Sequence, residues 1–317
     1  MRLLNLDKIT LGVSGTWAGF LRDWDRTLRA GNYPETTRYN YILAVAQLAR
    51  YLDGMGLEGA EGAQDPTRVK KPHIEAFQSW MISSRSAATA LNKHKALQQF
   101  FKWLTVDEAE IDRSPMEHVK QPRTAQKLIP IMQDDDTSKI LATCRGKSFI
   151  QVRDEAIIRL LCNTGARLSE VGFLKVEDID LNTDSVHYHG KGSKDRRVRF
   201  GHRTARALSR YLRARAQHNG AMLPDLWLAD RGGRPLAPNG IKIMIRRRGL
   251  AAGLTGIHAH RWRHTFAHAW KRARGDSGDL MLLMGWTSDD MPRHYGASAA
   301  AERAQETQVR MGIGDHV

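Results

Sequence analysis

The chain has 317 residues, 41% of them hydrophobic, which is enough for two folded domains with separate cores. No stretch reaches the roughly 18 to 20 apolar residues of a membrane-spanning helix, and the first ten residues lack the apolar core of a signal peptide. Cys144 and Cys162 each lie in an apolar helical pattern, so we expect buried thiols in a reducing compartment. These features argue against membrane and disulfide-rich secreted proteins and predict a cytoplasmic location.

The charge is strongly positive and unevenly distributed. Lys and Arg number 49 against 34 Asp and Glu, so the formal net charge is +15. Residues 1–125 carry 17 basic and 14 acidic side chains, whereas residues 126–317 carry 32 and 20, giving +3 and +12. This excess favours a polyanionic partner, nucleic acid above all, although charge alone fits a basic solvated surface equally well.

The first part of the chain predicts a small all-helical domain. Basic residues near the start of its last predicted helix, Arg85, Lys93 and Lys95, suit contact with DNA phosphates. A solvated helix face explains each of them as well. Apolar residues recur with helical spacing in four segments, separated by clusters of Gly, Pro and Asp: 17–28, 35–55, 73–83 and 87–103.

A proline-containing linker separates this domain from a second one. Residues 114–130 hold three prolines and little apolar periodicity, which predicts an extended segment with the domain boundary near residue 125. The expected fold is mainly α with a small antiparallel β-sheet, in domains at 1–120 and 131–317 joined by a linker at 121–130. Beyond the linker we predict helices at 134–144 and 152–164, strands at 184–189 and 196–200, helices from residue 204 and a helical tail at 299–311.

The segment TGARLSE, residues 164–170, joins two predicted helices. Gly165 fits a left-handed cap at the end of the first helix, so Arg167 opens the second, with Glu170 three residues later. The planar guanidinium of Arg167 can hold two phosphate oxygens at once, a geometry that Lys does not reproduce. A surface ion pair between Arg167 and Glu170 is the simpler alternative.

The segment GKGSKDRRV, residues 190–198, lies between the two predicted strands. It places Lys191 at or near the tip of a β-hairpin, where glycines allow close approach to a ligand. Lys191 can therefore reach an active site or a DNA groove, and Lys194 and Arg196 are candidate DNA contacts. A solvated charged turn is the alternative. The GxxxxGK[ST] pattern and its strand-to-helix context are absent, so nucleotide hydrolysis is not expected.

The segment HRWRHTFAH begins at His260. On a helix His260 and Arg263 share a face, so their side chains can converge on one phosphate. His264, one turn from His260, raises a zinc site as an alternative. Arg261 stands where the zinc-protease pattern HExxH has Glu, and a neighbouring cation opposes metal binding. We expect no metal here and a structural role for His264 and His268.

Two aromatic residues complete the pattern. Trp286 follows Gly285 at the end of an apolar helix, and Tyr295 comes nine positions later, in a short predicted helical segment after Pro292. A core tryptophan is the usual explanation for Trp286, but its indole N–H can donate to a phosphate oxygen. A phenol with a pKa of about 10 is a poor nucleophile until it is deprotonated, and nearby cations lower that cost. Phosphoryl transfer needs such a set of donors, an acid and an in-line nucleophile.

In this order, and with the nine-residue step from Trp286 to Tyr295, these segments resemble the tyrosine recombinase, or phage integrase, family. The resemblance covers the catalytic half well. The helical first domain and basic linker are similar to that family's SAM-like core-DNA-binding domain. Glu170 matches a family position with a supporting role. The resemblance implies that Arg167 and Arg263 clamp the non-bridging oxygens, Lys191 protonates the leaving 5′ oxygen, His260 assists proton transfer, Trp286 donates to the phosphate and Tyr295 attacks.

The resemblance also implies an activity and partners. It implies a site-specific recombinase or integrase that cleaves and rejoins double-stranded DNA sites through a covalent 3′-phosphotyrosine and a Holliday junction. A homo-tetramer would hold two DNA sites, and an accessory DNA-bending or directionality protein would be a further partner. The enzyme would act in the nucleoid. No cofactor, metal or ATP is implied. A type IB topoisomerase-like nicking and closing enzyme, and a DNA-binding regulator on an inactive scaffold, remain the alternatives.

Overall fold

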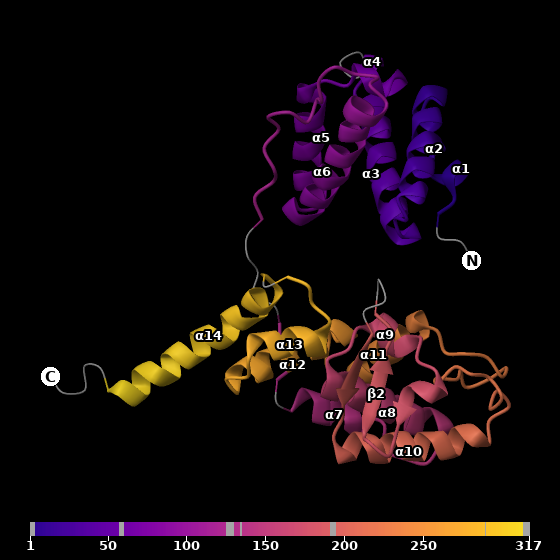
Figure 1. The fold of residues 1–317 in the computed structure, drawn as a ribbon, viewed down its shortest axis with the longest axis vertical. Helices are drawn as coiled ribbons and strands as arrows, with labels where there is room; N and C mark the ends of the chain where they lie inside the picture. The colour runs from indigo at the N-terminus through magenta and orange to yellow at the C-terminus, as the bar shows by residue number, and fades with distance from the viewer. Residues whose placement is uncertain are drawn as a thin grey trace. The chain divides into compact units, whose positions relative to one another are not determined.

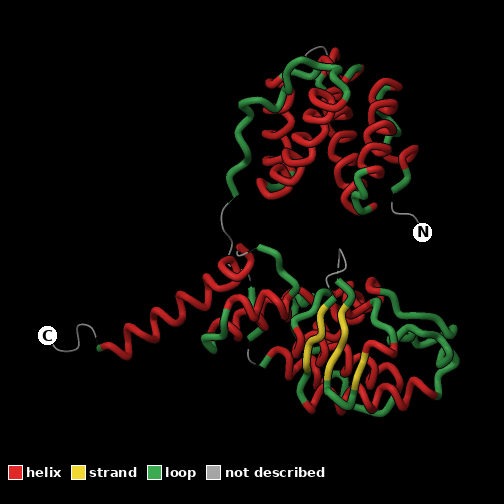
Figure 2. Tube along the Cα trace, in the orientation of Figure 1, coloured by secondary structure: helices red, strands yellow, loops and turns green. Residues whose placement is uncertain are grey.

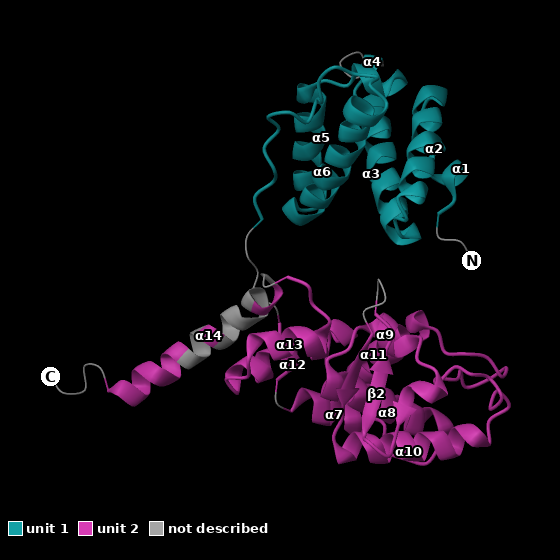
Figure 3. Cartoon of the chain, in the orientation of Figure 1, with its two compact units in different colours: residues 1–126 teal, residues 127–317 magenta. Residues whose placement is uncertain are grey.

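The computed structural model describes residues 4–56, 60–124, 130–133, 135–190, 195–288 and 290–312, with backbone only at 60, 290, 293–299 and 301–303. The chain divides into two compact units, residues 1–126 and 127–317 (Figures 1 and 3). Each unit has its own hydrophobic core. The boundary follows Gln126, inside the segment predicted to be a linker.

The regular secondary structure described in unit 1 is all helical. The side chain of Ser14 accepts a hydrogen bond from the backbone N–H of Trp17 ahead of α2, and Ser86 caps α6 in the same way through Thr89. The predicted helices at 17–28, 35–55, 73–83 and 87–103 are confirmed as α2, α3, α5 and α6. The elements are α1 (Leu6–Ile9), α2 (Gly15–Ala30), α3 (Glu35–Gly54), α4 (Ala60–Gln64), η2 (Pro66–Arg68), α5 (Lys71–Ser84), α6 (Ala87–Lys102) and the π-helical turn η3 (Trp103–Asp107).

Aromatic side chains fill the core between these helices. Trp17 of α2 stacks on Phe100 of α6 with ring centroids 5.8 Å apart, and Trp24 meets the same ring edge-on at 5.1 Å. Such pairs add about 0.5 to 1.5 kcal/mol each beyond the burial of apolar area. Both tryptophans are almost completely buried, so α2 and α6 are fixed relative to each other.

Unit 2 packs helices against a small sheet (Figure 2). The mainly helical fold with an antiparallel sheet is as the sequence predicts. The elements are α7 (Asp136–Ala142), α8 (Phe149–Thr164), α9 (Leu168–Gly172), η4 (Val176–Asp178), β1 (Ile179–Asp180), β2 (Ser185–Tyr188), β3 (Arg196–Arg199), α10 (His202–Ala216), α11 (Pro238–Ala251), α12 (Ala259–Arg272), α13 (Ser277–Met284) and α14 (Asp290–Met311).

The sheet of the described residues has the order β1-β2-β3 and is antiparallel throughout. Ile179 pairs with Val186, and Val186 pairs in turn with Val198. The predicted strands at 184–189 and 196–200 are confirmed as β2 and β3. Strand β1 was not predicted, because two residues are too few to show the alternation of a strand.

Helix α8 is the buried centre of unit 2 and contacts α10 and α12. It starts at Ser148, which shares a capping box with Gln151. It ends at Gly165, whose φ of 59° is the left-handed C-cap predicted from the sequence. A Cβ at Gly165 would lie 2.9 Å from Phe266 Cγ, so the chain turns there in close contact with α12.

The two cysteines are both free, but only one is buried. Cys144 lies in the core, as predicted, whereas Cys162 is exposed, contrary to the prediction. Cys162 follows the buried pair Leu160 and Leu161 but lies on the side of α8 that carries Gln151, Glu155 and Arg159, so helical spacing indicates its outward position. Within the described ranges, no helix is long and apolar enough to cross a membrane.

Candidate active site

Arg167 lies where α8 gives way to α9. It is the N-cap residue of α9, two positions beyond the Gly165 turn, which confirms the expectation that it opens a helix. Its backbone N–H donates to Glu170 Oε2 at 2.7 Å and its Nη1 donates to Glu170 Oε1 at 2.8 Å. The ion pair between Arg167 and Glu170, which the sequence offered as an alternative, is therefore present. The Arg167 side chain nevertheless remains 40% exposed and accessible to a ligand.

Arg263 is buried in α12, with 1% of its surface exposed. Its Nη1 donates to the carbonyl of Gly165 at 2.9 Å and its Nη2 to the carbonyl of Met284 at 2.6 Å. The guanidinium carbon lies 5.3 Å from the centroid of Trp286, within range of a cation–π contact. Because a buried charge is costly unless it is bonded, these carbonyls and the indole explain how the guanidinium is tolerated in the interior.

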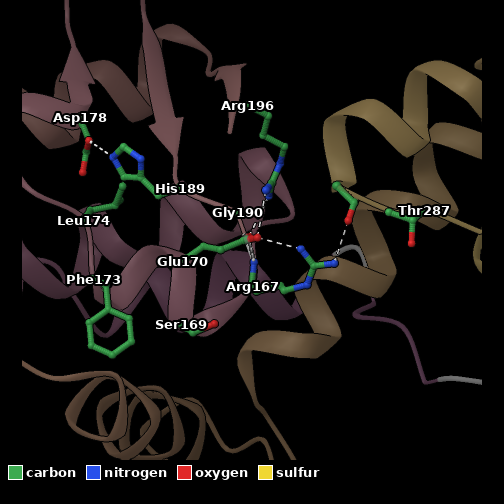
Figure 4. Close-up of a pocket in the computed structure, with 11 residues that line it drawn as sticks. Arg167, Ser169, Glu170, Phe173, Leu174, Asp178, His189, Gly190, Arg196 and Thr287 are labelled. Atoms are coloured by element: carbon green, nitrogen blue, oxygen red, sulfur yellow. Dashed lines mark hydrogen bonds and ion pairs between the residues drawn. The ribbon is translucent and has the colours of Figure 1, made fainter. Parts of the chain in front are cut away.

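The turn at the end of α13 brings the two arginines together. Gly285 caps this helix in the left-handed conformation, with a φ of 60°. Its carbonyl accepts from Arg167 Nη2 at 3.0 Å, next to the Met284 carbonyl that accepts from Arg263 (Figure 4 shows the Arg167 bond). Two guanidiniums from distant parts of the sequence are thus bound to adjacent peptide carbonyls.

Glu170 joins a third arginine to this group. Its side chain is 7% exposed and accepts from Arg196 Nη1 and Nη2 at 2.9 and 2.8 Å (Figure 4). Burial alone would raise the pKa of the Glu170 carboxyl, but the hydrogen bonds from Arg196 and Arg167 outweigh it and lower the pKa to about 2. Glu170 is therefore ionised at neutral pH and holds both guanidiniums in place.

The Arg196 side chain makes its contacts within the protein. Its side chain is 9% exposed, its Nε donates to the Leu283 carbonyl at 2.7 Å, and its guanidinium lies over the Tyr188 ring. This geometry favours a supporting role over the direct DNA contact predicted from the sequence. The inward position of Arg196 could be predicted from the sequence, because residues two apart on a strand share a face and the apolar Val198 is buried.

His260 lies in the first turn of α12, one turn before Arg263. Its ring meets the His264 ring edge-on, with centroids 4.5 Å apart. Burial and the nearby charges of Arg263, His258 and Arg167 lower the pKa of the His260 imidazole below its ordinary value of 6.5. His260 is therefore neutral at physiological pH, which suits a proton acceptor better than a phosphate anchor.

Some of the predicted site residues lie outside the described part of the structure. Lys191 and Lys194 belong to residues 191–194, which are not described. Tyr295 falls within helix α14, without a described side chain. Helix α14 contacts both α12 and α13, the helices that carry His260 and the Gly285 turn. The predicted helical segment around Tyr295 is thus part of a longer helix, which also includes the predicted tail.

The DNA contacts predicted in unit 1 lie around the α5–α6 junction. Arg85 is the C-cap residue of α5 and is exposed, as is Lys95 in α6. Lys93 is half-buried, and burial lowers the pKa of its ammonium. The three side chains remain candidate contacts, with Lys93 the least accessible of them.

Comparison with known proteins agrees with this geometry. The family model described as "Phage integrase family" matches residues 130–302, and the model "Phage integrase, N-terminal SAM-like domain" matches residues 20–111. Relatives named "Tyrosine recombinase XerC" include one from Bacillus pumilus, 29% identical over 260 residues that cover 80% of this chain and 83% of the relative. One from Lactobacillus delbrueckii subsp. bulgaricus is 30% identical over 221 residues, covering 69% and 75%.

Solved structures share the fold. The XerH site-specific recombinase in a post-cleavage complex with a palindromic difH substrate aligns with a TM-score of 0.73 and 20% identity, covering 92% of this chain and 84% of that one. A lambda integrase tetramer bound to a Holliday junction aligns with a TM-score of 0.66 and 17% identity, covering 93% and 81%.

Proposed function

This chain belongs to the phage integrase family, the tyrosine recombinases, and is a site-specific DNA recombinase. We propose that Tyr295 is its nucleophile and that residues 131–317 form its catalytic domain. The proposal rests above all on one observation. Arg167 and Arg263 are bound to the neighbouring carbonyls of Gly285 and Met284, so two cations are held ready at one position. Such an arrangement suits the non-bridging oxygens of a single phosphodiester.

The proposed division of labour follows from each side chain's surroundings. Arg263 is fixed by buried hydrogen bonds, so it needs no reordering when charge develops on the phosphate. Arg167 is partly exposed, so its guanidinium is accessible to the phosphate oxygens. Trp286, 8% exposed beside Arg263, adds an indole N–H donor. Glu170 and Arg196 hold Arg167 in position rather than touch the substrate.

The proposed chemistry is two balanced transesterifications. The Tyr295 oxygen attacks the phosphorus and gives its proton to neutral His260, while the bond from phosphorus to the 5′ oxygen breaks and Lys191 protonates the leaving oxygen. A 3′-phosphotyrosine results. In the second step a 5′ hydroxyl attacks this phosphorus and gives its proton to Lys191, while the bond from phosphorus to the Tyr295 oxygen breaks and His260 returns the proton to that oxygen. One phosphodiester replaces another of similar energy, so no ATP is consumed.

We further propose how the chain assembles on DNA. Unit 1, with residues 1–120 as its core-DNA-binding domain, would grip the duplex through residues such as Arg85 and Lys95. A homo-tetramer would pair two recombination sites, as the lambda integrase tetramer does on its Holliday junction. An accessory DNA-bending or directionality protein would act on the same sites. Because its substrate is DNA, we place the enzyme in the cytoplasm with the nucleoid.

A nicked suicide substrate tests the nucleophile. Wild type, Tyr295→Phe and Tyr33→Phe are incubated with a library of attachment-site duplexes, and covalent protein–DNA adducts are resolved by denaturing electrophoresis. Tyr33 is a partly exposed tyrosine of unit 1 and serves as the matched control. We expect an adduct with wild type and Tyr33→Phe and none with Tyr295→Phe, whose DNA binding should persist. An adduct of full yield with Tyr295→Phe would reject the assignment.

The same reactions separate the alternatives. Supercoil relaxation without recombinant products would indicate a topoisomerase-like enzyme. Binding of a site without any adduct from wild type would indicate a regulator on an inactive scaffold. Recombinant products joined at the cleavage site support the recombinase.

A further inference from the structure

Two histidines and two aspartates gather on one face of the small sheet, and two of them, Asp178 and His189, line the same pocket as Arg167 (Figure 4). His187 and His189 are two positions apart along β2 and its end, so they point to the same face, opposite the buried Val186 and Tyr188. Their ring centroids are 4.5 Å apart.

The strand register adds one carboxylate on each side. Ile179 of β1 pairs with Val186, and continuing that antiparallel register places Asp178 opposite His187. Arg196 of β3 pairs with Tyr188, which places Asp195 opposite His189. Because directly opposed residues share a face, all four side chains lie together.

The observed contacts agree with the register. His189 Nε2 lies 2.9 Å from Asp178 Oδ1, and its Nδ1 lies 3.2 Å from Asp195 Oδ2 (the Asp178 contact is drawn in Figure 4). His187 Nε2 lies 3.4 Å from the same Asp195 oxygen. The other oxygen of Asp178 is fixed by the backbone N–H of Lys175 at 2.7 Å.

We infer that Asp178, His187 and His189 form a binding site for a divalent transition-metal ion of the zinc type. One ligand atom from each lies within 4.8 Å of the other two. A tetrahedral ion with ligands at roughly 2.0 to 2.1 Å needs them about 3.3 Å apart, so a small closure of the side chains is sufficient. Imidazole and carboxylate without thiolate favour Zn²⁺ and its neighbours over Cu(I).

The surroundings of these ligands suit a cation. Asp195 can accept from His189 Nδ1, which fixes the ring and leaves Nε2 as the metal ligand, the usual arrangement around protein-bound zinc. Among the described residues, Asp178, Asp180 and Asp195 contribute three carboxylates to this face. Two guanidiniums share it: Arg197 pairs with Asp180, and Arg199 donates to the Thr183 carbonyl. A divalent ion would therefore meet more carboxylates than cations among these side chains.

A bound ion would cross-link η4, the end of β2 and, through Asp195, the start of β3. His189 precedes Lys191 by two residues, so the ion would brace the base of the segment that carries the proposed general acid. The metal site itself depends on η4, β2 and the residues next to the strands, and it stands independently of the proposed reaction.

Metal titration of the full-length chain without DNA and without a histidine tag tests the site. After removal of metal by a chelator, CoCl₂ is added while the visible absorption of bound Co²⁺ is followed, and ZnCl₂ is then used to displace it. We expect one ion per chain, displacement by Zn²⁺ and a higher melting temperature with Zn²⁺. His187→Ala should weaken binding at least about tenfold and remove the thermal shift.

The controls identify which histidines bind. His202→Ala changes an exposed histidine at the start of α10, outside the cluster, and should bind as wild type does. His187→Asn serves as a second variant if the circular dichroism of His187→Ala shows misfolding. Absence of stoichiometric binding by wild type, unchanged affinity in both His187 variants, or loss of binding in His260→Ala instead would each overturn the inference.

Discussion

Three guanidiniums are packed together at the site, and the way each is bonded determines what it can do. One carboxylate, Glu170, serves both Arg167 and Arg196, while peptide carbonyls serve Arg263. Carbonyl dipoles fix a guanidinium without neutralising its charge. The group therefore keeps a net positive charge, which is what a phosphodiester requires.

The lowered pKa of His260 predicts a pH dependence. As a proton acceptor it works only when neutral, so adduct formation should fall as the pH drops through a value below 6.5, where the ring becomes charged. We expect this acid limb in the rate of adduct formation on a suicide substrate. His260→Gln should slow the reaction by about 10² or more at neutral pH and abolish the limb. An unchanged acid midpoint in His260→Gln, with His202→Gln as the control, would assign the proton transfer elsewhere.

At the scale of elements, the site depends on where helices end. The left-handed turns at Gly165 and Gly285 expose the carbonyls that hold Arg263 and Arg167. The sequence predicted the Gly165 cap from the pattern of α8. It did not predict that the Gly285 carbonyl binds Arg167, because that bond joins α9 to α13, two elements remote in the chain.

Gly285→Ala separates backbone strain from crowding. A Cβ there would lie 3.1 Å from Arg196 Nη1 and 3.4 Å from Arg167 Nη1, at a φ of 60°. Gly253 has a φ of 73° with open space around it and is the matched control. Both alanine variants should lose about 1 to 2 kcal/mol of unfolding free energy through the left-handed conformation, measured by denaturant titration. Only Gly285→Ala should reduce adduct formation strongly, and equal activity in the two variants would argue against a precise role for this turn.

At the scale of the whole molecule, basic residues are present in both units. Residues 126–317 carry most of the net charge of +15, yet the helical unit 1 also presents exposed basic residues at its α5–α6 junction. We expect unit 2 to bind DNA at the cleaved phosphate and unit 1 to bind the duplex separately. Binding should therefore be dominated by phosphate contacts.

Salt should weaken DNA binding steeply. If about 6 phosphates are neutralised, affinity should fall about 10³-fold between 50 and 200 mM salt. Fluorescence anisotropy with Tyr295→Phe measures this without covalent trapping. Lys95→Gln should reduce the slope of log affinity against log salt by about 1, whereas Lys8→Gln, an exposed lysine in α1, should not. A flat response in wild type would remove the electrostatic account of binding.

The sequence by itself determined the longer helices, the two longer strands and the family, because periodicity, capping residues and motif order are local properties of the chain. It also identified the basic side chains of the site. Only the tertiary structure showed that Arg196 shares Glu170 with Arg167, that the Gly285 carbonyl binds Arg167, and that Asp178 and Asp195 flank His189. Each of these depends on strand register or on packing between distant elements, and such contacts are decided only when the whole core is assembled.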